Sequence, residues 1–115
     1  MDVQREIVLP TTREDAWEAL TEPNRLEEWF ATEVELDLRE GGAAVFRWGD
    51  GDARYAEVVR VEDEERLVLR FEDDGVLDLR LADDEDGTRV LVRESAPQWG
   101  TALELSALAS WAAAA

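Results

Sequence analysis

The chain of 115 residues contains no cysteine, no histidine and no lysine. Without Cys it has no disulfide bond, no thiolate nucleophile and no cysteine-ligated metal centre. Without His it lacks the side chain that most often serves as a general base near neutral pH, so the usual catalytic triads and most transition-metal sites are excluded. We therefore expect no cofactor.

Positive charge is also scarce, because 12 arginines stand against 29 acidic residues and the net charge is −17. A protein needs excess positive charge to displace phosphate counterions, so nucleic acid and anionic membrane surfaces are excluded as partners. The first residues contain no apolar core of signal-peptide length, and we expect a cytoplasmic protein. With 45% hydrophobic residues the chain can still form one core, which predicts a single domain over residues 1–115.

The first 30 residues predict one strand and two short helices. Residues 2–9 alternate as a strand does, and Pro10 ends the strand because it removes a backbone donor. Thr11 or Thr12 can cap a helix. Pro23 suits the first turn of a second helix, so the pattern indicates a helix pair rather than one long helix.

From Thr32 onward apolar and polar residues alternate with a period of two, which is typical of strands with one solvent-facing side. Glycine-containing and acidic turns separate the alternating runs. The runs predict strands over residues 33–38, 43–48, 53–62, 66–72, 76–81 and 88–94. With the first strand they form an antiparallel sheet of about six or seven strands.

The composition changes abruptly at residue 95. Glu104 is the only charged residue of the segment 95–115. Pro97 opens a helical stretch in which Trp99 and Leu103 share one stripe and further apolar residues occupy the other side. A helix that is apolar nearly all round must be covered on more than one face. We predict a long C-terminal helix here.

Three motifs resemble those of a known family. Residues 16–30, AWEALTEPNRLEEWF, resemble the W-x-A-L-T-x-P-x-x-L-x-x-W signature of the START-like (SRPBCC) superfamily, and the closest group is that of proteins similar to the activator of the heat-shock-90 ATPase. Residues 38–42, LREGG, are similar to the L-R-x-G-G turn of this group, and residues 61–67, VEDEERL, are similar to its V-x-P-P-x-R-L strand connection.

The resemblance implies an α+β protein with the helix-grip fold. In this fold a curved antiparallel sheet wraps around a long C-terminal helix, and two short helices follow the first strand. The superfamily includes lipid carriers, polyketide cyclases, hormone receptors and co-chaperone domains, so the fold alone selects no function.

Two carboxylates are predicted on the inner face of the sheet. On the strand expected over 53–62, Tyr55 and Glu57 fall on the same side as the inward valines, and on the strand over 88–94 Glu94 does. A carboxyl group in a water-poor pocket can act as an acid or base through a raised pKa, or it can bind a polar group of a ligand. The alternatives are that each carboxylate lies at a solvent-exposed strand end or pairs with an arginine.

Aromatic side chains provide a second set of candidates, because small-molecule pockets are lined mainly by apolar and aromatic residues with a few polar groups. Aromatic rings also fill small cores, and this alternative is preferred for Trp17, Phe71 and Trp111. The candidate ligand-contacting residues are Trp29, Phe30, Phe46, Trp48, Tyr55, Glu57, Phe71, Trp99 and Leu103.

Two acidic turns superficially resemble sites for hard cations. One contains Asp50 and Asp52, and the other covers residues 83–86. Neither has the calcium-loop pattern with its closing Glu. We interpret both as solvated turns and predict no metal site.

Three functions fit these observations. The preferred one is a non-enzymatic module that binds a small apolar ligand between the sheet and the final helix. The second is an enzyme of the polyketide cyclase or dehydratase kind that uses Glu57 or Glu94 with Tyr55 or an arginine. The third is an interaction domain, either co-chaperone-like or a homodimer joined through the C-terminal helix, since an exposed apolar surface of that extent marks a partner site.

Overall fold

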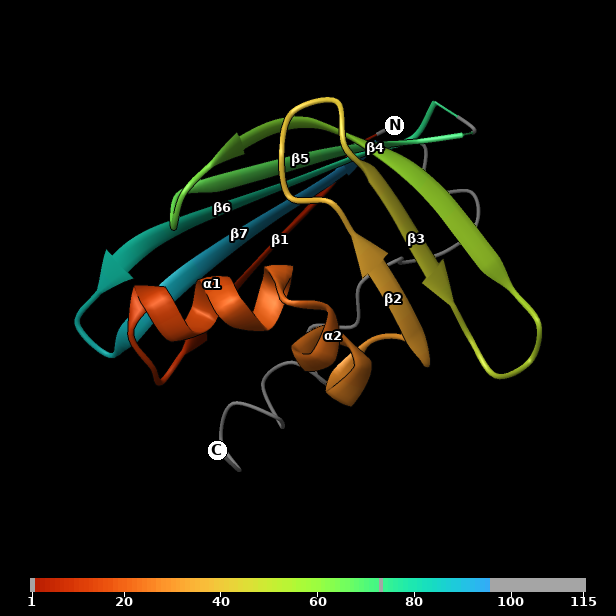
Figure 1. Cartoon of the computed structure of the whole chain (residues 1–115). Helices are drawn as coiled ribbons and strands as arrows, with labels where there is room; N and C mark the ends of the chain where they lie inside the picture. Colours follow the sequence, from red (N-terminus) through yellow and green to blue (C-terminus); the bar gives the residue numbers. More distant parts are fainter. Residues whose placement is uncertain (1, 73, 96–115) are drawn as a thin grey trace.

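The computed structural model describes residues 2–72 and 74–95 of the chain. A strand, two short helices and six further strands follow one another in this part (Figure 1). The elements are β1 (Asp2–Leu9), α1 (Arg13–Thr21), α2 (Pro23–Trp29), β2 (Glu33–Leu36), β3 (Ala43–Arg47), β4 (Ala53–Glu62), β5 (Arg66–Phe71), β6 (Val76–Asp84) and β7 (Gly87–Ser95).

This order confirms the predicted first strand, helix pair and meander. The hairpin between β6 and β7 is tighter than expected, because Asp83 and Asp84 belong to β6 and not to a solvated turn. The predicted C-terminal helix lies outside the described residues, together with its candidate residues Trp99 and Leu103.

The helix pair forms where the local signals place it. The side chain of Thr12 caps α1 by accepting a hydrogen bond of 3.2 Å from the backbone N–H of Asp15. The helix ends at Thr21, and Pro23 opens α2, where the missing N–H of proline costs nothing. Leu26 is the one buried residue of α2, whose seven residues are all described.

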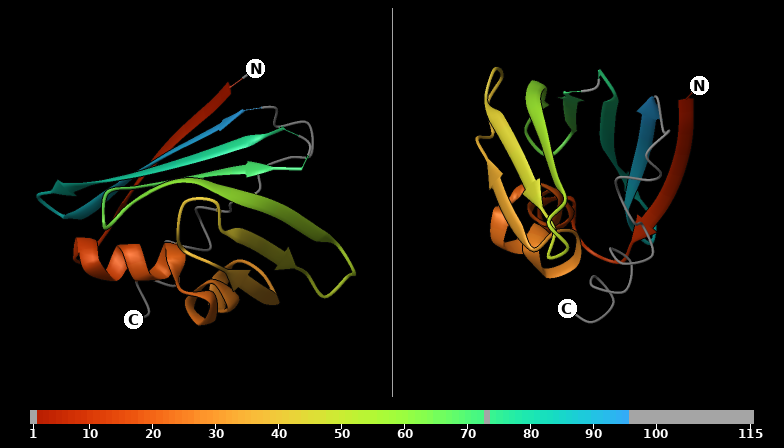
Figure 2. Two further views of the ribbon diagram at one scale, coloured as in Figure 1. Left: turned by 45° about the horizontal axis from the view of Figure 1, so that its top comes forward. Right: turned by 90° about the vertical axis from the view of Figure 1, so that its right-hand side faces the viewer.

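The seven strands form one antiparallel sheet with the order β1-β7-β6-β5-β4-β3-β2. β1 is first in the chain but pairs with the last described strand, so that Ile7 lies opposite Val90 and Leu9 opposite Thr88. The sheet is strongly bent, and its two edge strands stand on opposite sides of the bend (Figure 2). Both helices lie on the concave side (Figures 1 and 2).

Two glycines of the L-R-x-G-G motif shape the loop between β2 and β3. Gly41 has a φ of +85°, a backbone conformation that favours glycine. A Cβ on Gly42 would lie 2.1 Å from the carbonyl oxygen of Asp37, so only glycine fits there. The loop is fastened to β4, because Gly41 N–H donates to the Val58 carbonyl and Val58 N–H donates to the Gly42 carbonyl, each at 2.8 Å.

The predicted inward face of β4 is wrong. Tyr55 and Val59 are 45% and 42% exposed, and Glu57 is exposed as well, whereas Val58 is completely buried. The pairing with β5 shifts between Val58 and Arg60, so Val59 is an extra residue that forms a bulge. A bulge reverses the alternation of sides along a strand. Alternation counted back from Val61 without the bulge would turn Tyr55 and Glu57 inward. Because of the bulge, these two residues face outward instead.

Candidate functional site

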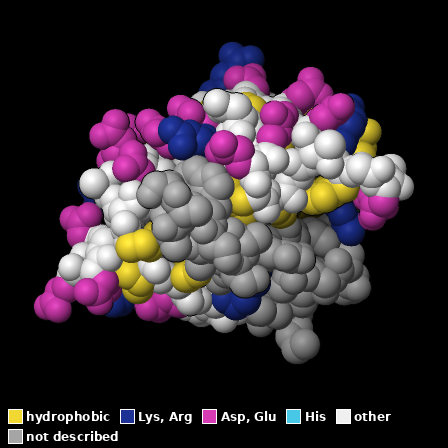
Figure 3. Space-filling model, turned by 90° about the horizontal axis from the view of Figure 1, so that it is seen from below, with side chains coloured by type: hydrophobic (Ala, Val, Ile, Leu, Met, Phe, Trp, Pro, Cys, Tyr) yellow, Lys and Arg dark blue, Asp and Glu magenta, His cyan; other side chains and the backbone are white. Residues whose placement is uncertain are grey.

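The concave face of the sheet is a continuous apolar surface. Its buried apolar side chains come from all seven strands and are Leu9, Val34, Ala44, Phe46, Val58, Leu67, Leu69, Phe71, Leu77, Leu79, Leu81, Val90 and Val92. Leu20 of α1 and Leu26 of α2 pack onto it. In the view from below, hydrophobic side chains reach the surface in patches, while acidic side chains gather along the outer margin (Figure 3).

A small cavity lies where the two helices meet the sheet. Its volume is about 20 Å³, and it is lined by Leu20, Leu26, Phe30, Leu36, Phe46, Leu67, Leu69, Leu77 and Leu79. This volume accommodates about one water molecule. Because the described residues of its walls are hydrocarbon and offer no polar partners, the cavity suits part of an apolar molecule better than water.

Five of the predicted ligand-contacting aromatic residues come together beside this cavity. The ring of Phe30 lies at the centre of the group, 5.5 Å from Trp29, 5.4 Å from Phe46 and 5.3 Å from Trp48 between ring centroids. Phe71 lies 6.3 Å from Phe46. The sequence prediction therefore identified a real cluster, although these residues come from α2, from the segment after it, from β3 and β5, and from the connection between β3 and β4.

The two tryptophans of this cluster are fixed by the backbone. The indole N–H of Trp29 donates to the Ala19 carbonyl at 2.9 Å, and that of Trp48 donates to the Phe30 carbonyl at 2.9 Å. The indole N–H is the only polar group of a tryptophan side chain, so both side chains make their hydrogen bond within the protein. The rings can offer a ligand an apolar surface but no hydrogen bond.

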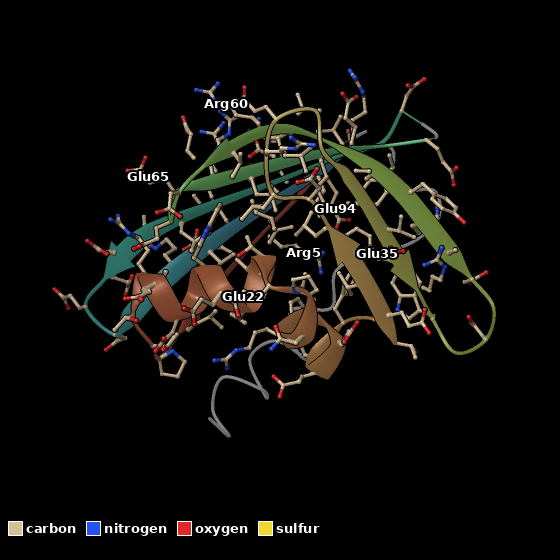
Figure 4. The ribbon with its side chains drawn as sticks, viewed as in Figure 1. Arg5, Glu22, Glu35, Arg60, Glu65 and Glu94 are labelled. Atoms are coloured by element: carbon tan, nitrogen blue, oxygen red, sulfur yellow. The ribbon has the colours of Figure 1, made fainter. Side chains whose placement is uncertain are left out.

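The predicted inward carboxylate of β7 is confirmed, and it is paired. Glu94 is 5% exposed, and its Oε1 atom lies 2.8 Å from Nη2 of Arg5 on β1. Both side chains extend beneath the sheet (Figure 4). On the concave face the pair lies among apolar residues, since Arg5 is opposite Val92 and Glu94 is opposite Leu77.

Sequence reasoning missed Arg5. A signal was present, because Arg5, Ile7 and Leu9 alternate along β1, so that a strand with Leu9 facing inward must also turn Arg5 inward. Leu9 is completely buried. The charge of Arg5 obscured this, since arginine is mostly found on the surface.

The other proposed acid–base residues lie elsewhere. Glu57 is on the convex face, where its Oε1 atom accepts a 2.9 Å hydrogen bond from Arg70, and about half of each side chain is exposed. Tyr55 is exposed on the same face. The sheet itself therefore separates Glu57 and Tyr55 from Glu94, and the three residues form no common site.

A second buried carboxylate lies on the convex face. Asp78 on β6 accepts two hydrogen bonds from Arg66, at 3.2 and 2.9 Å, and one from Arg80 at 3.4 Å. Burial of Asp78 acts to raise its pKa, but the hydrogen bonds from Arg66 and Arg80 outweigh this effect, and the pKa of Asp78 lies below its ordinary value. This cluster joins β5 to β6.

Two further observations limit the possible sites. Among residues 2–72 and 74–95, no three acidic side chains are grouped closely enough to hold a metal ion. No helix in the same part of the chain is long and apolar enough to cross a membrane.

The sequence model of the family described as "Activator of Hsp90 ATPase homolog 1-like protein" matches residues 10–112. The chain belongs to this family. The match includes both helices and the six-strand meander, and the resemblance based on the three motifs is confirmed. No curated protein is significantly similar to this AHSA1-like chain.

Solved structures share the fold of this AHSA1-like protein. The AHSA1-like protein from Aeromonas hydrophila is 24% identical, with a TM-score of 0.78 and coverage of 96% of this chain and 84% of its own. Protein NE0264 from Nitrosomonas europaea is 21% identical, with a TM-score of 0.78 and coverage of 99% and 95%. DynU16, a protein of the dynemicin biosynthetic locus, is 25% identical with a TM-score of 0.77, and the match covers 95% of this chain and 42% of DynU16.

Proposed function

We propose that this protein binds a small, mostly apolar molecule on the concave face of its sheet, beside α1 and α2, and catalyses no reaction. The observation that carries the proposal is the juxtaposition of the aromatic cluster with an all-hydrocarbon cavity. Apolar and aromatic walls are what small-molecule sites are made of. The place of DynU16 in a biosynthetic locus agrees with a role close to small-molecule metabolism.

The size of the cavity indicates which part must move. Sites for small organic ligands have volumes of about 300–1,000 Å³, whereas the cavity measures about 20 Å³. Only Leu26 of α2 is buried, and the helix is otherwise held by hydrogen bonds from Trp29 to the Ala19 carbonyl and from the Val34 N–H to Glu27. Displacing α2 with Phe30 would open the cavity toward the aromatic cluster, so we expect binding to be coupled to movement of this helix.

The enzymatic alternative has less support from the geometry. It would depend on Glu94 with Arg5, because Tyr55 and Glu57 lie on the opposite face of the sheet. Glu94 is moreover held by Arg5 at 2.8 Å.

Titration with naphthalene, followed by tryptophan fluorescence and by amide NMR, tests the binding proposal. We expect saturable shifts in α2 and in the leucines of the cavity. Leu69→Phe, which fills the cavity, should weaken binding about tenfold, or about 1.4 kcal/mol. Val59→Phe adds a ring on the outer face as the matched control and should leave binding unchanged. The absence of saturable shifts with naphthalene, or equal effects of the two variants, would contradict the proposal.

A further inference from the structure

The buried pair Arg5–Glu94 suggests what the ligand carries besides its apolar part. We infer that the pair forms the polar end of the site and receives an uncharged hydroxyl or carbonyl group. This inference rests on the proposed function, which it extends by naming the chemical class of the ligand. Three features of the pair support it: its position, its unused hydrogen-bonding capacity and its charge balance.

The position places the pair at the end of the apolar surface. Glu94 lies directly opposite Leu77 on the neighbouring strand, and Leu77 lines the cavity. A ligand that enters the cavity beside α2 and extends across β6 therefore reaches Glu94 and then Arg5. Figure 4 shows both labelled side chains under the bent sheet, on the side where the helices lie.

The hydrogen-bonding capacity of the pair is largely unused within the described residues. A guanidinium group has five N–H donors, and one contact, from Nη2 to Glu94, accounts for the ion pair. The Nε atom of Arg5 is buried and has no hydrogen-bond partner in this part of the chain. Because a buried donor without an acceptor is costly, such a group requires an explanation.

The pair is partly exposed to solvent. The Arg5 side chain is 24% exposed and the Glu94 side chain 6%, so an approaching atom meets the arginine first. A carbonyl oxygen can accept a hydrogen bond from the guanidinium group. A hydroxyl group can do the same and can also donate to the second carboxylate oxygen of Glu94.

The charge balance selects an uncharged group. Glu94 already compensates Arg5 at 2.8 Å, so the pair is neutral as a unit. A ligand carboxylate would add an uncompensated negative charge to a weakly hydrated place in a protein of net charge −17. An ammonium group would meet the guanidinium charge of Arg5 before it reached Glu94.

Three probes of nearly equal shape test the inference: naphthalene, 2-naphthol and 2-naphthoate. We expect 2-naphthol to bind the wild-type protein about tenfold more tightly than naphthalene, the equivalent of one hydrogen bond to a charged group. 2-Naphthoate should bind less tightly than 2-naphthol. Equal binding of naphthalene and 2-naphthol would overturn the inference and leave the proposed function intact, whereas no binding of any of the three would contradict the proposed function itself.

The double variant Arg5→Met with Glu94→Leu shows whether this pair causes the preference for 2-naphthol over naphthalene. Replacing both partners of a buried pair by apolar residues is often tolerated. The ratio of naphthalene to 2-naphthol dissociation constants should fall to about one. The matched control, Arg70→Met with Glu57→Leu, makes the same change to the exposed pair of the convex face and should keep the wild-type ratio. If the double variant does not fold, Arg5→Lys is used instead and should lower the ratio of the two dissociation constants. A ratio that stays at the wild-type value in either variant overturns the inference.

Discussion

Replacing Asp78 by alanine should destabilise the protein far more than the same change at Glu57. Both residues are acidic, both lie on the convex face, and both pair with an arginine of β5. They differ in burial, because the Asp78 side chain is 11% exposed and that of Glu57 is 51% exposed. The comparison therefore measures what burial and a second arginine partner, Arg80, add to an ion pair between strands.

The structure indicates the magnitude. Asp78→Ala removes two hydrogen bonds from Arg66 and the longer one from Arg80. It also leaves these two arginines, which are direct partners across β5 and β6, facing each other without the carboxylate that both contact. Breaking a largely buried pair in this way costs about 3 kcal/mol, whereas an exposed pair such as that of Glu57 contributes at most about 1 kcal/mol.

Urea unfolding followed by tryptophan fluorescence measures the difference. With a slope of about 1.5 kcal/mol per molar urea, Asp78→Ala should lower the midpoint by about 2 M and Glu57→Ala by less than about 0.7 M. The double replacement of Asp78 and Arg66 by leucine should recover much of the lost stability, because Arg66 and Arg80 then no longer face each other as two like charges. Equal midpoints for the two alanine variants would refute the argument from burial.

Three further predictions concern stability. The pKa of Asp78 is lowered in the folded state, so the ionised carboxylate stabilises the fold. This stabilisation is complete above the ordinary pKa of an aspartate and is lost as the pH falls through the lower, folded-state pKa. The stability of Asp78→Asn, measured during acid titration, should therefore fall less steeply than that of the wild type. Val58→Ala should cost about 2 kcal/mol and Val59→Ala less than about 0.5 kcal/mol, and the reverse order, measured by urea unfolding, would disprove the bulge. Gly87→Ala should lower the stability by about 3 kcal/mol or more, because the new Cβ would lie 2.0 Å from the Leu9 carbonyl oxygen. Gly51 also has a positive φ but has open space around it, so Gly51→Ala should cost about 1 kcal/mol. Thermal unfolding compares the two variants, and equal losses of stability would contradict the steric explanation.

The candidate site was predictable in part. Trp29, Phe30, Phe46 and Trp48 were identified because aromatic residues line small-molecule pockets and because these residues occur at the helix corner or on the run over residues 43–48. Glu94 was identified because β7 alternates without interruption. Arg5 was missed for the opposite reason, since its charge obscured a regular alternation.

The sequence by itself determined the order of the elements, the helix caps and the family. These features depend on neighbours within a few residues, such as Thr12 before α1, Pro23 before α2 and the glycines of the L-R-x-G-G turn. Local interactions of this kind are visible in a linear chain.

Only the tertiary structure decided which side of β4 faces inward and which charges become partners. The bulge at Val59 lies next to Val58, whose two backbone groups bind the loop of Gly41 and Gly42, and this contact is distant in sequence. Likewise Arg5 and Glu94 are 89 residues apart and meet because β1 pairs with β7. Strand pairing is set by the packing of the whole sheet, which no local pattern encodes.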